Sequence, residues 1–203
     1  MKLFMVHRLI LVLMLGTHVL NSQQRPEVRT IDFRNFTFPF PPNPGSRVPD
    51  DVRWMETDVR TTVTLVNGRR DFSRSEPSRG PSVVLGQVYY GYLTMSGQLD
   101  ALVVLSYHTG GTAHWNYVYA YSMASGNPRL LGWFQTGDRA HSGLYRLRVN
   151  NGGFTLDVFD PEKQEADCCS AGFVRTKYLW RNGKFVPGGL PEFGRVEDEP
   201  KPR

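Results

Sequence analysis

The chain has little of the residues from which catalytic and metal sites are built. Cysteine occurs only twice, and the five histidines fall to three, His108, His114 and His141, if an N-terminal leader is removed. Neither the G-x-S-x-G motif of serine hydrolases nor the H-E-x-x-H zinc motif is present. The spacing of the three histidines matches no common zinc site. The sequence therefore predicts no metal site, no cofactor and no catalytic residue.

The chain also has no apolar run long enough to cross a membrane as a helix. Its longest apolar run, 9–15, follows the basic residues Lys2 and Arg8, continues more weakly to Leu20 with His18 interrupting it, and is followed by the polar pair Asn21 and Ser22. A membrane-spanning helix needs about 20 apolar residues. A short basic segment followed by a run of this length is typical of a secretory signal. We expect cleavage after residue 22, with no transmembrane anchor left. No cysteine lies at that boundary, so a lipid anchor is not expected and the product is periplasmic or secreted.

Charge of one sign is not concentrated in this sequence. The formal net charge is +5, and removal of the leader, with two basic residues and no acidic one, lowers it to +3. A nucleic-acid-binding surface requires basic residues gathered on one face. The cluster Arg69, Arg70, Arg74 and Arg79 lies among serine, proline and glycine residues, which is typical of a solvated loop. Nucleic acid is therefore not an expected partner.

Composition divides the chain into four segments. The leader, 1–22, is followed by an extended proline-rich arm, 23–58, with five prolines between positions 39 and 50. A β domain is expected over 59–186. The tail, 187–203, has four prolines and mixed charge with few large apolar residues, so we expect it to be disordered.

Alternating apolar and polar residues predict strands, and no useful window has helical periodicity. The predicted strands from residue 83 onward are 83–90, 101–107, 115–122, 130–134, 144–149, 154–159 and 173–180. Turn sequences separate them, among them Ser125-Gly126, Asn151-Gly152 and Asn182-Gly183. In 144–149 we expect Tyr145, Leu147 and Val149 on one face and the two arginines on the other. The expected fold is all-β, or β-rich α+β, with a single antiparallel meander sheet that curls into a barrel or a sandwich.

Four aromatic residues recur at every second position of one predicted strand, namely Trp115, Tyr117, Tyr119 and Tyr121. Rings at this spacing share one face of the strand. A core face is favoured, because Asn116 and Ser122 make the opposite face look solvated. The alternative is a platform on which sugar rings stack. The sequence leaves open which face is buried.

Any ligand is expected at polar loops beside the sheet, since loops on a rigid scaffold often carry recognition. One loop, Thr109-Gly110-Gly111-Thr112, lies between two histidines, and the other spans 137–141. The ligand-binding candidates are His108, Thr109, Thr112, His114, Trp115, Tyr117, Asp138, Arg139 and His141.

The two cysteines, Cys168 and Cys169, are adjacent. Neighbouring α-carbons lie about 3.8 Å apart, below the usual disulfide range. A bridge between them is strained and closes almost no loop, so its expected role is to clamp a tight turn. Free or intermolecular thiols, and a redox switch, are the alternatives that the sequence leaves open.

A series of short motifs resembles a group of exported bacterial proteins that includes the mycobacterial LppP/LprE-type lipoproteins. The motifs lie at 91–94, 100–107, 109–112, 138–140, 168–169 and 178–185, and the double cysteine followed by Trp180-x-x-Gly183-x-Phe185 is the most specific. Relatives carry an acidic G-D-x-x-G-D-G loop, from which this chain departs at Tyr92, Met95 and Ser96. The resemblance implies export, a β-rich domain and no assigned catalysis, whereas the missing lipobox cysteine means that lipid anchoring does not carry over.

The function predicted from these features is that of an exported, non-catalytic binding or envelope-associated protein. The expected partners are a glycan or another envelope protein. The alternative is a secreted hydrolase of envelope polysaccharide, with Asp100 and Asp138 as its carboxylates. Such an enzyme requires two carboxyl groups about 5–10 Å apart, which makes their separation the feature that distinguishes the two hypotheses.

Overall fold

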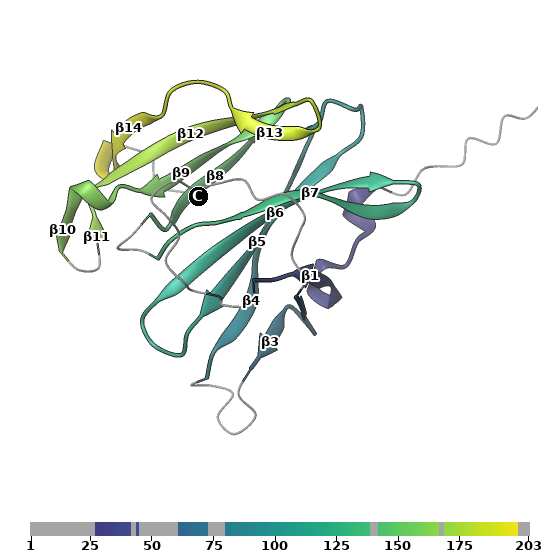
Figure 1. The fold of residues 1–203 in the computed structure, drawn as a ribbon, viewed down its shortest axis with the longest axis horizontal. Coiled ribbons are helices and arrows are strands. Elements are labelled where there is room, and N and C mark those ends of the chain that lie inside the picture. The colour runs from purple at the N-terminus through teal and green to yellow at the C-terminus, as the bar shows by residue number, and fades with distance from the viewer. Residues whose placement is uncertain are drawn as a thin grey trace, which may run out of the picture.

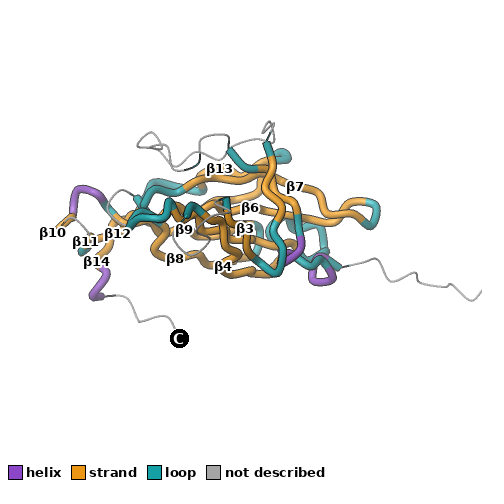
Figure 2. The backbone as a smooth tube through the Cα atoms, turned by 90° about the horizontal axis from the view of Figure 1, so that it is seen from below, coloured by secondary structure: helices purple, strands orange, loops and turns teal. Residues whose placement is uncertain are grey.

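The computed structural model describes residues 27–41, 44, 61–72, 80–138, 142–166 and 169–198. Over these residues the chain forms strands and short 3-10 helices (Figures 1 and 2). The strands are β1 Thr37–Pro39, β2 Thr62–Thr64, β3 Arg69–Asp71, β4 Ser82–Gly91, β5 Asp100–His108, β6 His114–Ala124, β7 Asn127–Gln135, β8 Leu144–Asn150, β9 Gly153–Phe159, β10 Gln164–Ala166, β11 Cys169–Ser170, β12 Gly172–Arg181, β13 Lys184–Pro187 and β14 Glu192–Arg195. The 3-10 helices are η1 Val28–Thr30, η2 Phe33–Asn35, η3 Pro161–Lys163 and η4 Val196–Asp198. The all-β prediction is confirmed.

The strands form two five-stranded antiparallel sheets rather than the single sheet that we predicted. The meander sheet has the order β3-β4-β5-β6-β7. The C-terminal sheet has the order β13-β12-β9-β8, and β14 pairs with β12 beside β13. Two small pairs, β1-β2 and β10-β11, complete the pairing. Every predicted strand from residue 83 onward is present. The strands are rich in apolar residues and are separated by turns whose residues adopt positive φ, such as Asn182 and Gly183.

An intersheet core lies between the two sheets, which face each other as in a sandwich (Figure 1). Phe134 of the meander sheet stacks on Phe154 and Tyr178 of the C-terminal sheet, with ring centroids 5.9 and 6.2 Å apart. At one seam, a Cβ built on Gly91 of β4 would lie 2.2 Å from Val149 Cγ1 of β8. Any larger residue at position 91 would therefore force the Val149 side chain to move where the two sheets meet.

A second core, the arm core, covers the other face of the meander sheet. Val28, Phe33, Phe38 and Phe40 of the N-terminal segment are all buried there. Phe38 contacts Tyr119 with ring centroids 5.3 Å apart, and the Tyr119 hydroxyl donates a 2.7 Å hydrogen bond to the Pro39 carbonyl. The expectation of a merely extended arm is therefore wrong for residues 27–40, which belong to the packed domain.

The C-terminal segment also differs from the prediction. Residues 192–195 form β14, whose register places Phe193 opposite Val174 of β12. Disorder is therefore the wrong description for 187–198, the described part of the tail. The Phe193 side chain is 72% exposed, so this strand is held by its main-chain pairing with β12 rather than by buried side chains. The sequence did not predict β14, because the strand carries no buried apolar residue.

A β-bulge changes the facing of one predicted strand. The register between β8 and β9 shifts between Leu144 and Arg146. Leu144 packs against the intersheet core. Tyr145 instead stacks on Phe173, on the opposite face of the C-terminal sheet, with ring centroids 5.5 Å apart. The expectation that Tyr145 shares a face with Leu147 and Val149 is therefore wrong, because a bulge reverses the alternation by one residue.

Among the residues described, no helix has both the length and the apolar character needed to span a bilayer.

Candidate functional site

Two predicted ligand-binding residues, His108 and His114, face each other at one end of the meander sheet. They are the last residue of β5 and the first of β6, and they are directly opposite in the antiparallel register. Their ring centroids lie 4.3 Å apart with the planes at 88°. Both side chains are half-exposed. The sheet thus fixes two imidazoles next to each other at the surface.

Polar residues of the neighbouring strands share this end of the sheet. Ser82 of β4 lies opposite His108, and Asp71 of β3 lies opposite Ser82. Arg69 donates from Nε to Asp71 Oδ1 at 2.8 Å, and this hydrogen bond lowers the pKa of Asp71. The pKa of His108 is also lowered, first by burial and then by the charges of His114 and Arg69.

The other predicted loop residues lie at the same end. Thr109 closes the hairpin, because its amide nitrogen donates to the Ala113 carbonyl at 3.4 Å, and Thr112 is exposed. Asp138 lies two residues beyond Thr136, whose amide donates to the Asn116 carbonyl at 2.8 Å. Arg139 and His141 lie outside the described residues. The structure thus brings His108, Thr109, Thr112 and His114 together and places the start of the second loop beside them.

The aromatic stripe is a core feature. Tyr117 and Tyr119 have no exposed surface and Tyr121 is 3% exposed, all three in the arm core. Trp115 is half-buried at the edge of that core. The opposite face of β6 is not solvated as predicted, since Val118 and Ala120 are completely buried against the C-terminal sheet. The sugar platform is therefore ruled out at Tyr117, because the N-terminal segment covers its ring.

The two aspartates of the hydrolase hypothesis lie at opposite ends of the meander sheet. Asp100 begins β5, whereas Asp138 lies three residues beyond Gln135, the last residue of β7, which is level with Leu105 of β5. Five residues of strand already separate Asp100 from the level of Gln135, or about 17 Å. Asp100 is completely buried, and its Oδ2 accepts hydrogen bonds from Thr94 N and Oγ1 at 2.8 and 2.9 Å. Asp100 therefore holds the β4–β5 loop and cannot act with Asp138 on one glycosidic bond.

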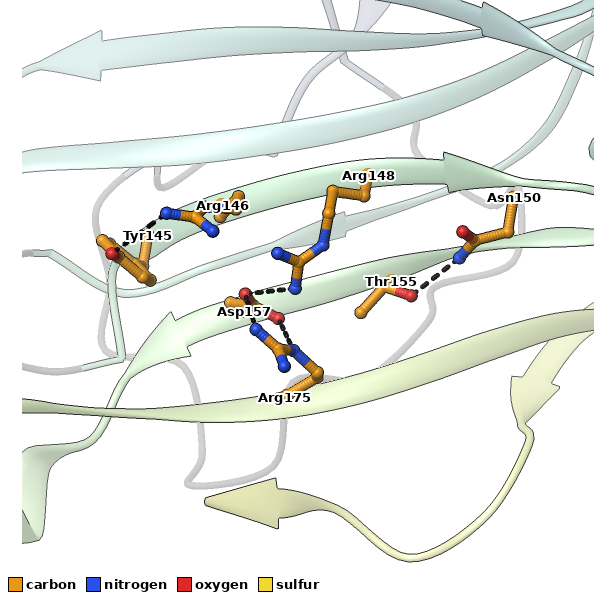
Figure 3. A network of polar contacts seen from close by, with 7 residues as sticks. All are labelled: Tyr145, Arg146, Arg148, Asn150, Thr155, Asp157 and Arg175. Atoms are coloured by element: carbon orange, nitrogen blue, oxygen red, sulfur yellow. Dashed lines mark hydrogen bonds and ion pairs between the residues drawn. The ribbon is translucent and has the colours of Figure 1, made fainter. Parts of the chain in front are cut away.

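A charged cluster crosses the outer face of the C-terminal sheet (Figure 3). Asp157 of β9 is completely buried, and the register places it between Arg146 of β8 and Arg175 of β12. Arg175 donates from Nε to Oδ1 at 2.9 Å and from Nη2 to Oδ2 at 3.0 Å. Arg148 Nη2 donates to Oδ2 at 2.7 Å. The cluster connects three strands, β8, β9 and β12. Of its charged residues, the sequence predicted a facing only for Arg146 and Arg148 of β8.

An open pocket of about 480 Å³ lies by β14, and another of about 340 Å³ lies among Phe40, Phe72 and Tyr107. A third pocket has a volume of about 420 Å³ and lies where the β6–β7 and β12–β13 hairpins approach each other. Trp180, Arg129, Lys184 and Asn182 contribute its polar and aromatic lining. We call it the hairpin pocket. It lies at the far end of the meander sheet from His108, because Leu130, another lining residue, is opposite Tyr121.

The hairpin pocket combines an indole ring with two cationic side chains and an amide. Trp180 is half-buried and packs on Phe185 with ring centroids 4.8 Å apart, which fixes the indole. Arg129, Asn182 and Lys184 are exposed. Sequence reasoning predicted both turns but missed this site, because the two hairpins are more than 50 residues apart in the chain. The signal that could have drawn attention to it was Trp180 beside the Asn182-Gly183 turn.

Comparison of the chain with protein-family models, with curated proteins and with solved structures finds no match. The resemblance to the LppP/LprE-type lipoproteins therefore stays a prediction. The vicinal disulfide also stays a prediction, because Cys168 lies outside the described residues.

Proposed function

We propose that this chain is an exported, non-catalytic binding protein whose ligand is an acidic glycan held in the hairpin pocket. The leader-like N-terminus supports export. The observation that carries the ligand class is the lining of the pocket, with Trp180 beside Arg129 and Lys184. Glycans of the cell envelope are the candidates that an exported protein of this kind would meet.

The chemistry of the lining suits a sugar with a carboxylate or phosphate group. An indole face stacks on the apolar face of a pyranose ring, with the ring edges and hydroxyls left for polar partners. Arginine binds a carboxylate or phosphate through two parallel N–H donors, and lysine contributes a mobile charge. The Asn182 amide offers both a donor and an acceptor to hydroxyl groups. A volume of about 420 Å³ lies within the range of small-ligand sites.

The position of the pocket fits binding rather than catalysis. It lies at the end of the space between the two sheets, where β-sandwiches and barrels commonly hold ligands. Trp180 N donates to the Gly152 carbonyl at 2.9 Å, so the main chain that carries the indole is held by the neighbouring β8–β9 turn. A rigid wall of this kind favours recognition, because little entropy is lost when a ligand binds.

The test measures binding of acidic and neutral oligosaccharides to the purified chain by calorimetry and by tryptophan fluorescence. We expect saturable binding of polygalacturonate fragments that weakens with added salt. Arg129→Gln and Lys184→Gln should each weaken binding about five-fold, which corresponds to about 1 kcal/mol for an exposed ion pair. Lys177→Gln is the matched control, because Lys177 is an exposed cation on the same strand as Trp180 but outside the pocket lining.

Two results would contradict the proposal. Equal binding of neutral and acidic oligosaccharides, or an effect of Lys177→Gln as large as those of the two pocket variants, would exclude the hairpin pocket as an acidic-glycan site. Release of new reducing ends during incubation would contradict the non-catalytic role and would point to catalytic carboxylates other than the pair Asp100 and Asp138.

A further inference from the structure

The histidine pair at the other end of the meander sheet is independent of the hairpin pocket. His108 and His114 are held by the pairing of β5 and β6, and a five-residue hairpin loop connects them. The next pair of residues on the same face, Ser106 and Asn116, joins the strands through a 2.7 Å hydrogen bond between their side chains. The two imidazoles are therefore brought together by the backbone before any ligand is present.

Exposure and the neighbouring charged groups decide whether a metal ion can reach the two imidazoles, which bind it in their neutral form. The charged groups that face the pair from β3 are Arg69 and Asp71, which are bound to each other at 2.7 Å. Both histidines are half-exposed, so an ion can reach them from solvent.

We propose that His108 and His114 together bind one divalent first-row transition-metal ion, with Cu²⁺ bound most tightly. A nitrogen of each ring would lie about 2 Å from the ion, so the two rings must be close neighbours. The ring centroids of His108 and His114 are 4.3 Å apart, which meets this requirement. Imidazole suits copper, nickel and zinc, and affinity for a given set of ligands is greatest for Cu²⁺. Among the described residues no third histidine, cysteine, aspartate or glutamate completes a cluster with the pair. Water or an external ligand would fill the other positions.

The test is a titration of the purified, tag-free chain with CuCl₂, NiCl₂ and ZnCl₂, followed by calorimetry. The background variant carries Cys168→Ser and Cys169→Ser, so that thiols cannot bind the ion. We expect one ion per chain, in the affinity order Cu²⁺ above Ni²⁺ and Zn²⁺. His108→Gln and His114→Gln should each weaken Cu²⁺ binding at least ten-fold. Asn127→Ala is the control, because Asn127 is an exposed amide at the start of β7, at the other end of the meander sheet from the histidine pair; its Cu²⁺ affinity should not change.

A second measurement does not depend on any histidine variant folding correctly. The electron paramagnetic resonance spectrum of the Cu²⁺-loaded background variant should show coupling to two imidazole nitrogens. A spectrum with fewer than two, absence of binding, or unchanged Cu²⁺ affinity in both glutamine variants would overturn the proposal. Thermal unfolding of each glutamine variant shows whether a loss of binding reflects the missing ligand or a disrupted sheet.

Discussion

The arginine cluster around Asp157 makes a quantitative prediction about stability. Asp157 is completely buried, whereas the side chains of Arg148 and Arg175 are 35% and 23% exposed. Water can therefore rehydrate either guanidinium after a substitution but cannot reach the carboxylate. Because a buried charge without a partner costs several kcal/mol, removing both arginines should be far more harmful than removing the aspartate.

The contacts set the size of each effect. Arg175→Gln removes two charge-assisted hydrogen bonds and should lower the free energy of unfolding by about 2 kcal/mol. Arg148→Gln removes one bond from a more exposed partner and should cost about 1 kcal/mol. The double variant removes all three hydrogen bonds described for the buried carboxylate, so we expect about 4–5 kcal/mol, more than the sum of the single effects. Asp157→Asn should cost about 2 kcal/mol, since both arginines are left partly hydrated.

Urea unfolding followed by circular dichroism measures these differences, provided that the slope of each transition is unchanged. Lys177→Gln is the control on the same sheet face, and its stability should change by less than about 0.5 kcal/mol. The reasoning is refuted if Asp157→Asn costs as much as the double arginine variant, or if the two arginine effects simply add.

Two further predictions test the arm core and the buried tyrosines. Phe38 has no exposed surface, so Phe38→Ala should lower the free energy of unfolding by about 3–5 kcal/mol, whereas Phe193→Ala, at a 72% exposed position, should change it by less than about 0.5 kcal/mol in the same urea assay. A large effect at Phe193 or none at Phe38 would contradict the packing described. Burial raises the pKa of Tyr178 to about 12 and also raises the pKa of Tyr119 and Tyr121. Because these folded-state values exceed the ordinary value of 10.0, the stability that they contribute is complete below pH 10 and is lost as the pH rises through the folded values. An absorbance titration at 295 nm should show the three rings ionising together with alkaline unfolding, and early ionisation of all tyrosines would refute their burial.

The sequence predicts the strands well because their signals are local. The strands from residue 83 onward have either alternating side chains or, as in 101–105, a short continuous apolar run, and they end near turns whose residues tolerate positive φ, such as Ser125 and Gly126. These features act over a few residues, so they are visible without knowledge of the fold. The division into two sheets is not local, since it depends on which edges meet after each meander has formed.

The candidate sites show the same limit. The hairpin at His108 and His114 is a local feature, and the sequence points to it directly. The hairpin pocket is lined by Arg129 of one sheet and Lys184 of the other. Because these residues are far apart in the chain, the sequence pattern does not indicate that they are close in space. Asp157 was also missed, because its partners Arg148 and Arg175 come from two different strands.

The N-terminal segment explains why the face of the tyrosine stripe could not be predicted. A single sequence shows that Tyr117 and Tyr119 share a face, but both faces of β6 are buried, one by the C-terminal sheet and one by the segment that includes Phe38. An apolar face with no cover would expose large rings to water, which soluble proteins seldom tolerate over a wide area. The meander sheet therefore depends on the N-terminal segment for its second layer. It follows that removal of residues 27–40 should expose the tyrosine face and promote aggregation, even though the prolines next to that segment made it look like a linker.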